Sequence, residues 1–132
     1  MFLTSKKGTV SNMKRVVVTG LGAVTPLGNT VAEYWENLKN GVNGIGMITR
    51  FDTTDFKCKV AAEVKNFDAA ERLDKVTARK TDPYVQYALC SADEAVADSG
   101  ILGTVEEDEL GVYFGSGVGG IQTLCENEEG LL

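Results

Sequence analysis

The chain of 132 residues is long enough for one domain and too short for two of ordinary size. Hydrophobic residues make up 43% of it and charged residues 24%, a balance that excludes a chain disordered throughout, and no apolar run approaches the roughly 20 residues that span a bilayer. The chain has no histidine, so it cannot alone supply the commonest general base, metal ligand or partner of a nucleophilic serine or cysteine.

Charge is distributed unevenly along the chain, whose net charge is −6. Residues 1–80 carry all 13 basic side chains and 8 acidic ones, whereas residues 81–132 carry 11 acidic side chains and no basic one. The negative total disfavours nucleic acid as a partner, and we expect none. The basic first part indicates either a site for an anionic partner or a solvated face, and composition does not choose between them.

The three cysteines, Cys58, Cys90 and Cys125, are odd in number and far apart. This spacing fits neither a disulfide framework nor a paired-cysteine metal site. We therefore expect a reducing, cytoplasmic location, with no metal and no organic cofactor held by this chain.

The first twelve residues differ from the rest. Residues 1–12 contain two lysines but lack the apolar core of a secretory signal, so we interpret them as a disordered extension. Met13 precedes the first run of apolar residues, and we place the start of the folded unit there, over residues 13–132.

The next elements are a strand and a helix. Residues 15–19 (RVVVT) are typical of a buried parallel strand, and a glycine-rich loop follows them. Thr30 and Glu33 have the spacing of a capping box, which predicts a helix from Val31 that ends near Asn40-Gly41. Its apolar stripe, which we expect to face the core, consists of Val31, Tyr34, Trp35 and Leu38.

The remainder of the chain continues this alternation. Residues 41–54 are predicted as a loop and residues 57–64 as a short strand. Asp82-Pro83 predicts the start of a helix, with Asp82 as its cap, and Ser99-Gly100 its end. Residues 110–114 (LGVYF) are typical of another buried strand, before a glycine loop and a final helix. Strands that alternate with helices predict an α/β fold whose sheet is mainly parallel.

The glycine loops permit a nucleotide-binding interpretation. Gly115, Gly117 and Gly120 follow a predicted strand in the order G-x-G-x-x-G, in which backbone N–H groups approach a pyrophosphate. The motif also needs an acidic residue about 20 positions after the last glycine, but only 12 residues follow Gly120 in this sequence. No P-loop sequence occurs in it. Close packing of helix on strand explains these glycines better, so a dinucleotide-binding domain is the less favoured alternative.

A specific resemblance emerges from the loops taken together. Residues 16–30 (VVVTGLGAVTPLGNT) resemble the N-terminal signature of β-ketoacyl-acyl-carrier-protein synthases, particularly those of the synthase II type. The similarity continues in register to about residue 124, through Tyr34-Trp35, Phe51-Asp52, RKTD at 79–82, QYA at 86–88, DSG at 98–100 and GSGVGG at 115–120. Each piece is weak alone, but the combination is specific.

This resemblance implies a thiolase-like fold, built from two duplicated α/β halves and assembled as a homodimer. It also implies decarboxylative Claisen condensation, in which malonyl-acyl-carrier-protein extends an acyl chain held on a catalytic cysteine, with two histidines assisting. In the family these three residues lie downstream of the region matched here. The chain is thus expected to be an incomplete N-terminal thiolase-like domain that is inactive alone, and no residue of it is assigned a catalytic role.

Two site assignments follow from the resemblance. Arg79 and Lys80 match a basic patch that docks the acyl carrier protein, and Val118 matches a position that lines the acyl pocket. Arg72, Lys75 and Arg79 would share one face if residues 72–79 formed a single helix. A solvated basic face and ordinary core packing remain the alternatives for the two sites.

Two further interpretations remain beside a fragment of an acyltransferase. One is a non-catalytic module that docks the carrier protein, and the other is the dinucleotide-binding domain. Because at most three strands are predicted, their edges would lack partners. We therefore expect the isolated chain to be poorly folded, to aggregate or to need a partner, and a sharp cooperative thermal transition of a monomer would contradict this.

Overall fold

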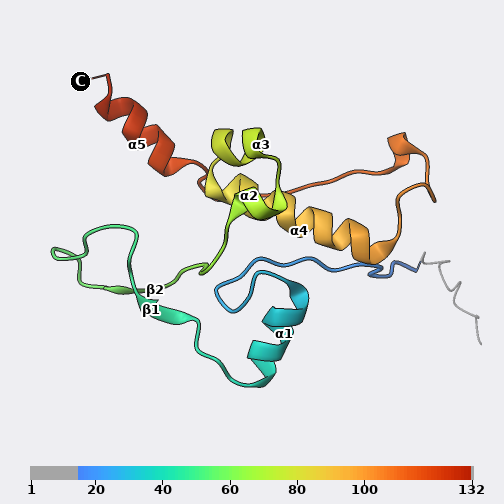
Figure 1. Cartoon of the computed structure of the whole chain (residues 1–132), viewed down its shortest axis with the longest axis horizontal. Helices are drawn as coiled ribbons and strands as arrows, with labels where there is room; N and C mark the ends of the chain where they lie inside the picture. The colour runs from blue at the N-terminus through green and yellow to red at the C-terminus, as the bar shows by residue number, and fades with distance from the viewer. Residues whose placement is uncertain (1–14, 132) are drawn as a thin grey trace, which may run out of the picture.

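The computed structural model describes residues 15–131, and the extension expected at residues 1–12 lies outside that range. Its elements are α1 (Val31–Lys39), β1 (Ile45–Met47), β2 (Val60–Ala62), α2 (Ala69–Arg72), α3 (Lys75–Lys80), α4 (Pro83–Ser99), the short 3₁₀ helix η1 (Glu107–Glu109) and α5 (Ile121–Glu129). In Figure 1, α2 and α3 lie beside the first turns of α4, the longest helix; α5 extends away at that end, and β1 and β2 lie apart from α4.

Helix α4 begins and ends where the sequence predicts. Pro83 occupies its first turn, and Gly100 ends it in the left-handed conformation at φ 61°. Cys90, in the middle of α4, is 1% exposed and is the one buried side chain among the described residues. The structure therefore has a helix-centred contact region but no extensive core.

Helix α1 confirms Thr30 as its cap, whereas the return bond of the predicted capping box goes to Asn29, the residue before the cap. The Glu33 N–H donates to Thr30 Oγ1 at 3.2 Å, and the Asn29 N–H donates to Glu33 Oε2 at 2.9 Å. The prediction that Trp35 lies in the core is wrong for this chain, because its side chain is 57% exposed. Trp35 borders a hollow of about 810 Å³ between α1 and α4, which no described segment fills.

The paired strands differ from the prediction. β1 and β2 form a two-stranded antiparallel sheet, with Ile45 opposite Ala62 and Met47 opposite Val60. β1 thus falls within the predicted loop 41–54, and the strand predicted over 57–64 is reduced to Val60–Ala62. Each strand has only three residues, too few for an alternating pattern to be recognised in the sequence.

The two predicted buried strands are extended segments without strand partners. Residues 15–19 and 110–114 run in the same direction along α4 (Figure 1), as parallel strands would. No backbone-to-backbone hydrogen bond joins them, and a hollow of about 540 Å³ is lined by residues 22–25, by α4 and by residues 110–114. The expected parallel pairing is therefore not formed in the described residues, which leave an incomplete α/β arrangement of helices and a small sheet.

Candidate functional site

The short helix α3, which carries the predicted docking residues, is held at both ends. Asp74 accepts hydrogen bonds from the N–H groups of Val76 at 2.9 Å and Thr77 at 3.0 Å. At the other end, Gln86 of α4 donates to the carbonyl oxygens of Ala78 at 2.9 Å and Thr81 at 2.8 Å. A six-residue helix is marginal alone, so the Asp74 cap supports its first turn and the Gln86 bonds fix its last turn against α4.

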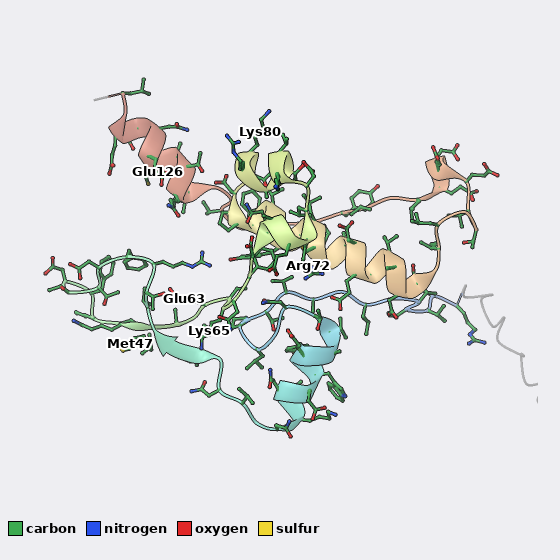
Figure 2. All side chains as sticks on the ribbon, viewed as in Figure 1. Met47, Glu63, Lys65, Arg72, Lys80 and Glu126 are labelled. Atoms are coloured by element: carbon green, nitrogen blue, oxygen red, sulfur yellow. The ribbon has the colours of Figure 1, made fainter. Side chains whose placement is uncertain are left out.

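Arg79 and Lys80 are exposed in the last turn of α3, where positive charge is favoured by the helix dipole. Figure 2 shows Lys80 at the outer end of the helix, directed away from the rest of the chain. Within residues 15–131 the only ion pair joins Lys39 to Glu36, so neither Arg79 nor Lys80 has an anionic partner there. With Val76 they surround a small hollow of about 230 Å³. We call Arg79 and Lys80 the basic end of α3.

Arg72 does not belong to this exposed group, because residues 72–79 do not form the single helix on which a shared face with Lys75 and Arg79 depended. α2 ends at Arg72, Leu73 is extended, and Asp74 starts α3. The Arg72 guanidinium is part-buried and donates to the carbonyl oxygens of Asn29 at 2.6 Å and Cys90 at 3.2 Å (Figure 2). It therefore joins the loop before α1 to α4 and is not available to a partner.

Val118 lies in the glycine loop before α5 and is 73% exposed. The structure does not bring it beside the basic end of α3 through any described hydrogen bond, and Val118 lines none of the described hollows. The role of Val118 in lining an acyl pocket therefore stays a prediction, because no other described residue forms a pocket with it.

The glycine loop packs against the start of α4. Gly119 lies so close to Tyr84 that an added Cβ would be 2.6 Å from the ring. Asp82 occupies the predicted cap position of α4 but forms no capping hydrogen bond; its carboxylate accepts from the hydroxyl of Thr123 in α5. A carboxylate beside the first turn of α5 opposes the binding of a pyrophosphate there, which disfavours the dinucleotide alternative.

None of the three thiols has the surroundings of a nucleophile. Burial is the main cause that raises the pKa of Cys90, which keeps this thiol protonated at neutral pH. Cys58 and Cys125 are exposed. The described residues contain no group of three side chains suited to a metal ion, and none of their helices is long and apolar enough to cross a membrane.

Two carboxylates of α4 hold the chain segment that leads into α1, a role that the sequence did not predict. Glu94 accepts from the N–H groups of Ala23 and Val31, each at 2.9 Å, and Asp98 accepts from the Leu21 N–H at 2.9 Å. Glu94 and Asp98 stand four residues apart on one helix face, the only signal that the sequence offered. Their partners are backbone groups more than 60 positions away, which no local pattern identifies.

The hairpin is joined to α4 by a further contact that was not predicted. Arg50, which follows β1, donates to the hydroxyl of Tyr87 at 2.8 Å, and this bond is the main cause that raises the Arg50 pKa. The Tyr87 ring also packs edge-on against Phe67, with ring centres 4.9 Å apart. These contacts orient α4 and the segment before α2 relative to the hairpin.

The known proteins whose sequences this chain resembles include β-ketoacyl and 3-oxoacyl synthases. The family model described as the N-terminal domain of β-ketoacyl synthase matches residues 13–131. The chain is 46% identical over 120 residues to 3-oxoacyl-[acyl-carrier-protein] synthase 2 of a Synechocystis species, covering 90% of this chain and 29% of that protein. It is also 46% identical over 115 residues to the protein of the same description from Staphylococcus aureus, covering 86% and 28%.

Solved structures agree in fold. The ishigamide ketosynthase/chain length factor matches with a TM-score of 0.68 and 33% identity, over 87% of this chain and 30% of that one. A β-ketoacyl synthase from Burkholderia phymatum matches with a TM-score of 0.65 and 31% identity, over 91% and 31%. The chain therefore spans less than a third of the length of these relatives.

Proposed function

The chain belongs to the β-ketoacyl synthase family, and from that premise we propose that it is the N-terminal part of a 3-oxoacyl-acyl-carrier-protein synthase. Such an enzyme lengthens acyl chains in fatty acid biosynthesis by condensation with malonyl-acyl-carrier-protein. In this proposal the polypeptide beyond the matched third supplies the cysteine and the two histidines. The present chain supplies part of the scaffold and of the partner surface.

The observation that carries the proposal is the basic end of α3. Its cations are exposed and lack anionic partners within the described residues, while the neighbouring Arg72 is committed to backbone carbonyls. Acyl carrier proteins are acidic, so their docking needs exposed positive charge on a fixed element. The caps at Asp74 and Gln86 provide that fixed element.

The role of this chain in the reaction is then to orient the carrier protein. Arg79 and Lys80 would attract the acidic carrier protein. The hydrogen bonds that join α3 to α4 would keep these two side chains in place, so that the carrier protein binds in one orientation. Val118, in the loop that follows the second extended segment, would form part of the wall against the acyl chain once the rest of the protein is present. We place the whole enzyme in the cytoplasm as a homodimer that needs no cofactor.

The test uses a chimera in which residues 13–131 replace the matching segment of the Synechocystis relative. Arg79→Glu with Lys80→Glu should raise the KM for the carrier-bound substrate by about tenfold at low salt, because two favourable charges become repulsive. It should leave kcat nearly unchanged and weaken the salt dependence of kcat/KM. A chimera without condensation activity would contradict the proposed enzyme, and unchanged kinetics of the double variant would contradict the docking role.

Lys57→Glu with Lys59→Glu is the matched control. Both residues are exposed and both changes reverse a positive charge, but they precede β2 and lie outside the basic end of α3. An equal rise of KM in this control would mean that the total charge matters and not the docking surface.

A non-catalytic docking module remains the second candidate, because the basic end of α3 is complete within this chain. Binding of an acyl carrier protein by the 132-residue chain alone, abolished by the Arg79 and Lys80 changes, would favour this candidate.

A further inference from the structure

Two asparagine–glycine pairs lie in the segment that joins α1 to β1, at the edge of the described structure (Figure 1). They are Asn40-Gly41 and Asn43-Gly44, and both asparagine side chains are exposed. In such a pair the backbone nitrogen of the glycine can attack the side-chain carbonyl carbon of the asparagine, because glycine has no Cβ to obstruct the approach. The two pairs are alike in sequence, so a difference in their reactivity has to come from the structure.

The Asn40-Gly41 pair is restrained by the end of α1. The Gly41 N–H, which contains the attacking nitrogen, donates to the Leu38 carbonyl at 3.1 Å, and Gly41 is left-handed at φ 65°. The Asn40 Nδ2 donates to the Glu36 carboxylate at 3.1 Å. Ring closure at Asn40 therefore has to break the first bond and to displace the second.

The Asn43-Gly44 pair has the opposite arrangement. Gly44 lies directly before β1, and within residues 15–131 its N–H donates no hydrogen bond. The Asn43 Oδ1 accepts from the Ile45 N–H at 2.9 Å, which closes a turn that contains the Gly44 nitrogen and holds the carboxamide beside it. The same bond places a donor on the oxygen where negative charge develops during the attack.

We infer that Asn43 is a modification site, at which water converts the side-chain amide to a carboxylate through a cyclic imide. The Gly44 nitrogen forms a bond to Asn43 Cγ and loses its proton to solvent base. The bond between Cγ and Nδ2 breaks, and Nδ2 takes up a proton and leaves as ammonia. Water then opens the imide at either of its two carbonyl groups, which yields aspartate or isoaspartate without any oxidation or reduction.

The conversion affects the hairpin because Asn43 stands close to its first strand. In isoaspartate the main chain passes through the side-chain carbonyl carbon, so the backbone becomes one methylene group longer just before β1. β1 pairs with β2 through three residues only, beginning with Ile45 opposite Ala62. We therefore expect the pairing of so short a sheet to weaken in the converted protein.

The experiment incubates the 132-residue chain in a mildly alkaline buffer and follows both asparagines in the tryptic peptide of residues 40–50 by fragmentation mass spectrometry. Asn43 should be converted at least about tenfold faster than Asn40, because ring closure at Asn40 must first break hydrogen bonds. An isoaspartate-specific methyltransferase should label the product. In guanidinium chloride, which removes the structure, the two rates should become nearly equal.

Matched variants assign the reaction to one pair. Asn43→Gln should abolish the fast reaction, because the longer side chain would have to close a larger ring, whereas Asn40→Gln should leave it unchanged. Both residues are exposed, so neither change removes buried packing. Glu36→Ala, which frees the Asn40 side chain, should accelerate conversion at Asn40 by about threefold and leave Asn43 unaffected.

Equal rates at the two asparagines in native buffer would overturn the inference, and so would faster conversion at Asn40 or loss of the fast reaction in Asn40→Gln. Hydrogen exchange checks the consequence for the hairpin: the amides of residues 45–47 should exchange at least about tenfold faster after conversion, and unchanged exchange would contradict that consequence. None of these measurements involves condensation activity, so the proposed function is tested separately.

Discussion

Gly22 crosses α4 in direct contact with the carbonyl of Ser91. A Cβ added at Gly22 would lie 1.8 Å from the Ser91 oxygen, and one added at Gly20 would lie 2.2 Å from that of Ala95. The first extended segment therefore approaches the helix backbone more closely than any side chain would allow. Close packing explains these glycines of the first loop without a nucleotide.

Gly22→Ala should destabilise the chimera by about 2–3 kcal/mol, because the obstructing atoms are backbone and can yield only if the segment moves away from α4. Thermal unfolding measures this change. Gly117→Ala is the control, since a Cβ there meets nothing within 4 Å, and it should change stability by less than about 0.5 kcal/mol. Equal effects of the two substitutions would contradict the close crossing.

Glu94→Ala should destabilise the chimera by about 2–4 kcal/mol, since it leaves the N–H groups of Ala23 and Val31 without their charged acceptor. Chemical denaturation measures the loss, and amide exchange at Val31 should accelerate. Asp93→Asn provides a comparison on the same helix, because Asp93 is exposed and accepts no described hydrogen bond. A Glu94→Ala protein as stable as the comparison would show that these bonds contribute nothing.

The cap of α3 should depend on pH. Hydrogen bonds from the Thr77 side chain, and then from backbone N–H groups, hold the pKa of Asp74 below its ordinary value of 3.8. The stabilisation is therefore fully present above pH 3.8 and is lost as the pH falls through the lower, folded-state value. A carboxyl-resolved NMR titration of the chimera should show this low pKa and its rise in Thr77→Val; an ordinary pKa in the parent chimera would contradict the cap.

The three thiols should react in a fixed order. Cys58 and Cys125 are exposed, whereas Cys90 is buried and its pKa is raised, so its thiolate is scarce as well as inaccessible. Alkylation near neutral pH, followed by mass spectrometry, should modify the first two at least about tenfold faster than Cys90. If Cys90 of the isolated chain reacts as fast as the others, the contacts around α4 do not persist in that chain.

The family, the bounds of α1 and α4 and the Thr30 cap of α1 were predictable from the sequence, whereas Asp82 stands at the predicted cap position of α4 without a capping hydrogen bond. The Thr30–Glu33 pair and the Pro83 and Gly100 boundaries act within a few residues, so their signals are local. The positions of the two extended segments and the exposed Arg79 and Lys80 were also predicted, although their docking role stays a prediction.

Contacts, burial and strand pairing that involve residues distant in the sequence could be learned only from the tertiary structure. Arg72, which the sequence suggested as a surface cation, instead joins the carbonyl groups of Asn29 and Cys90. Glu94 accepts hydrogen bonds from backbone N–H groups that lie far away in the sequence. Trp35 is exposed and the two strand-like segments are unpaired. Burial and pairing require neighbours that the described residues do not supply. Local sequence specifies which segments can form helices or extended runs, whereas partners far along the chain, or outside it, determine whether those runs become a sheet.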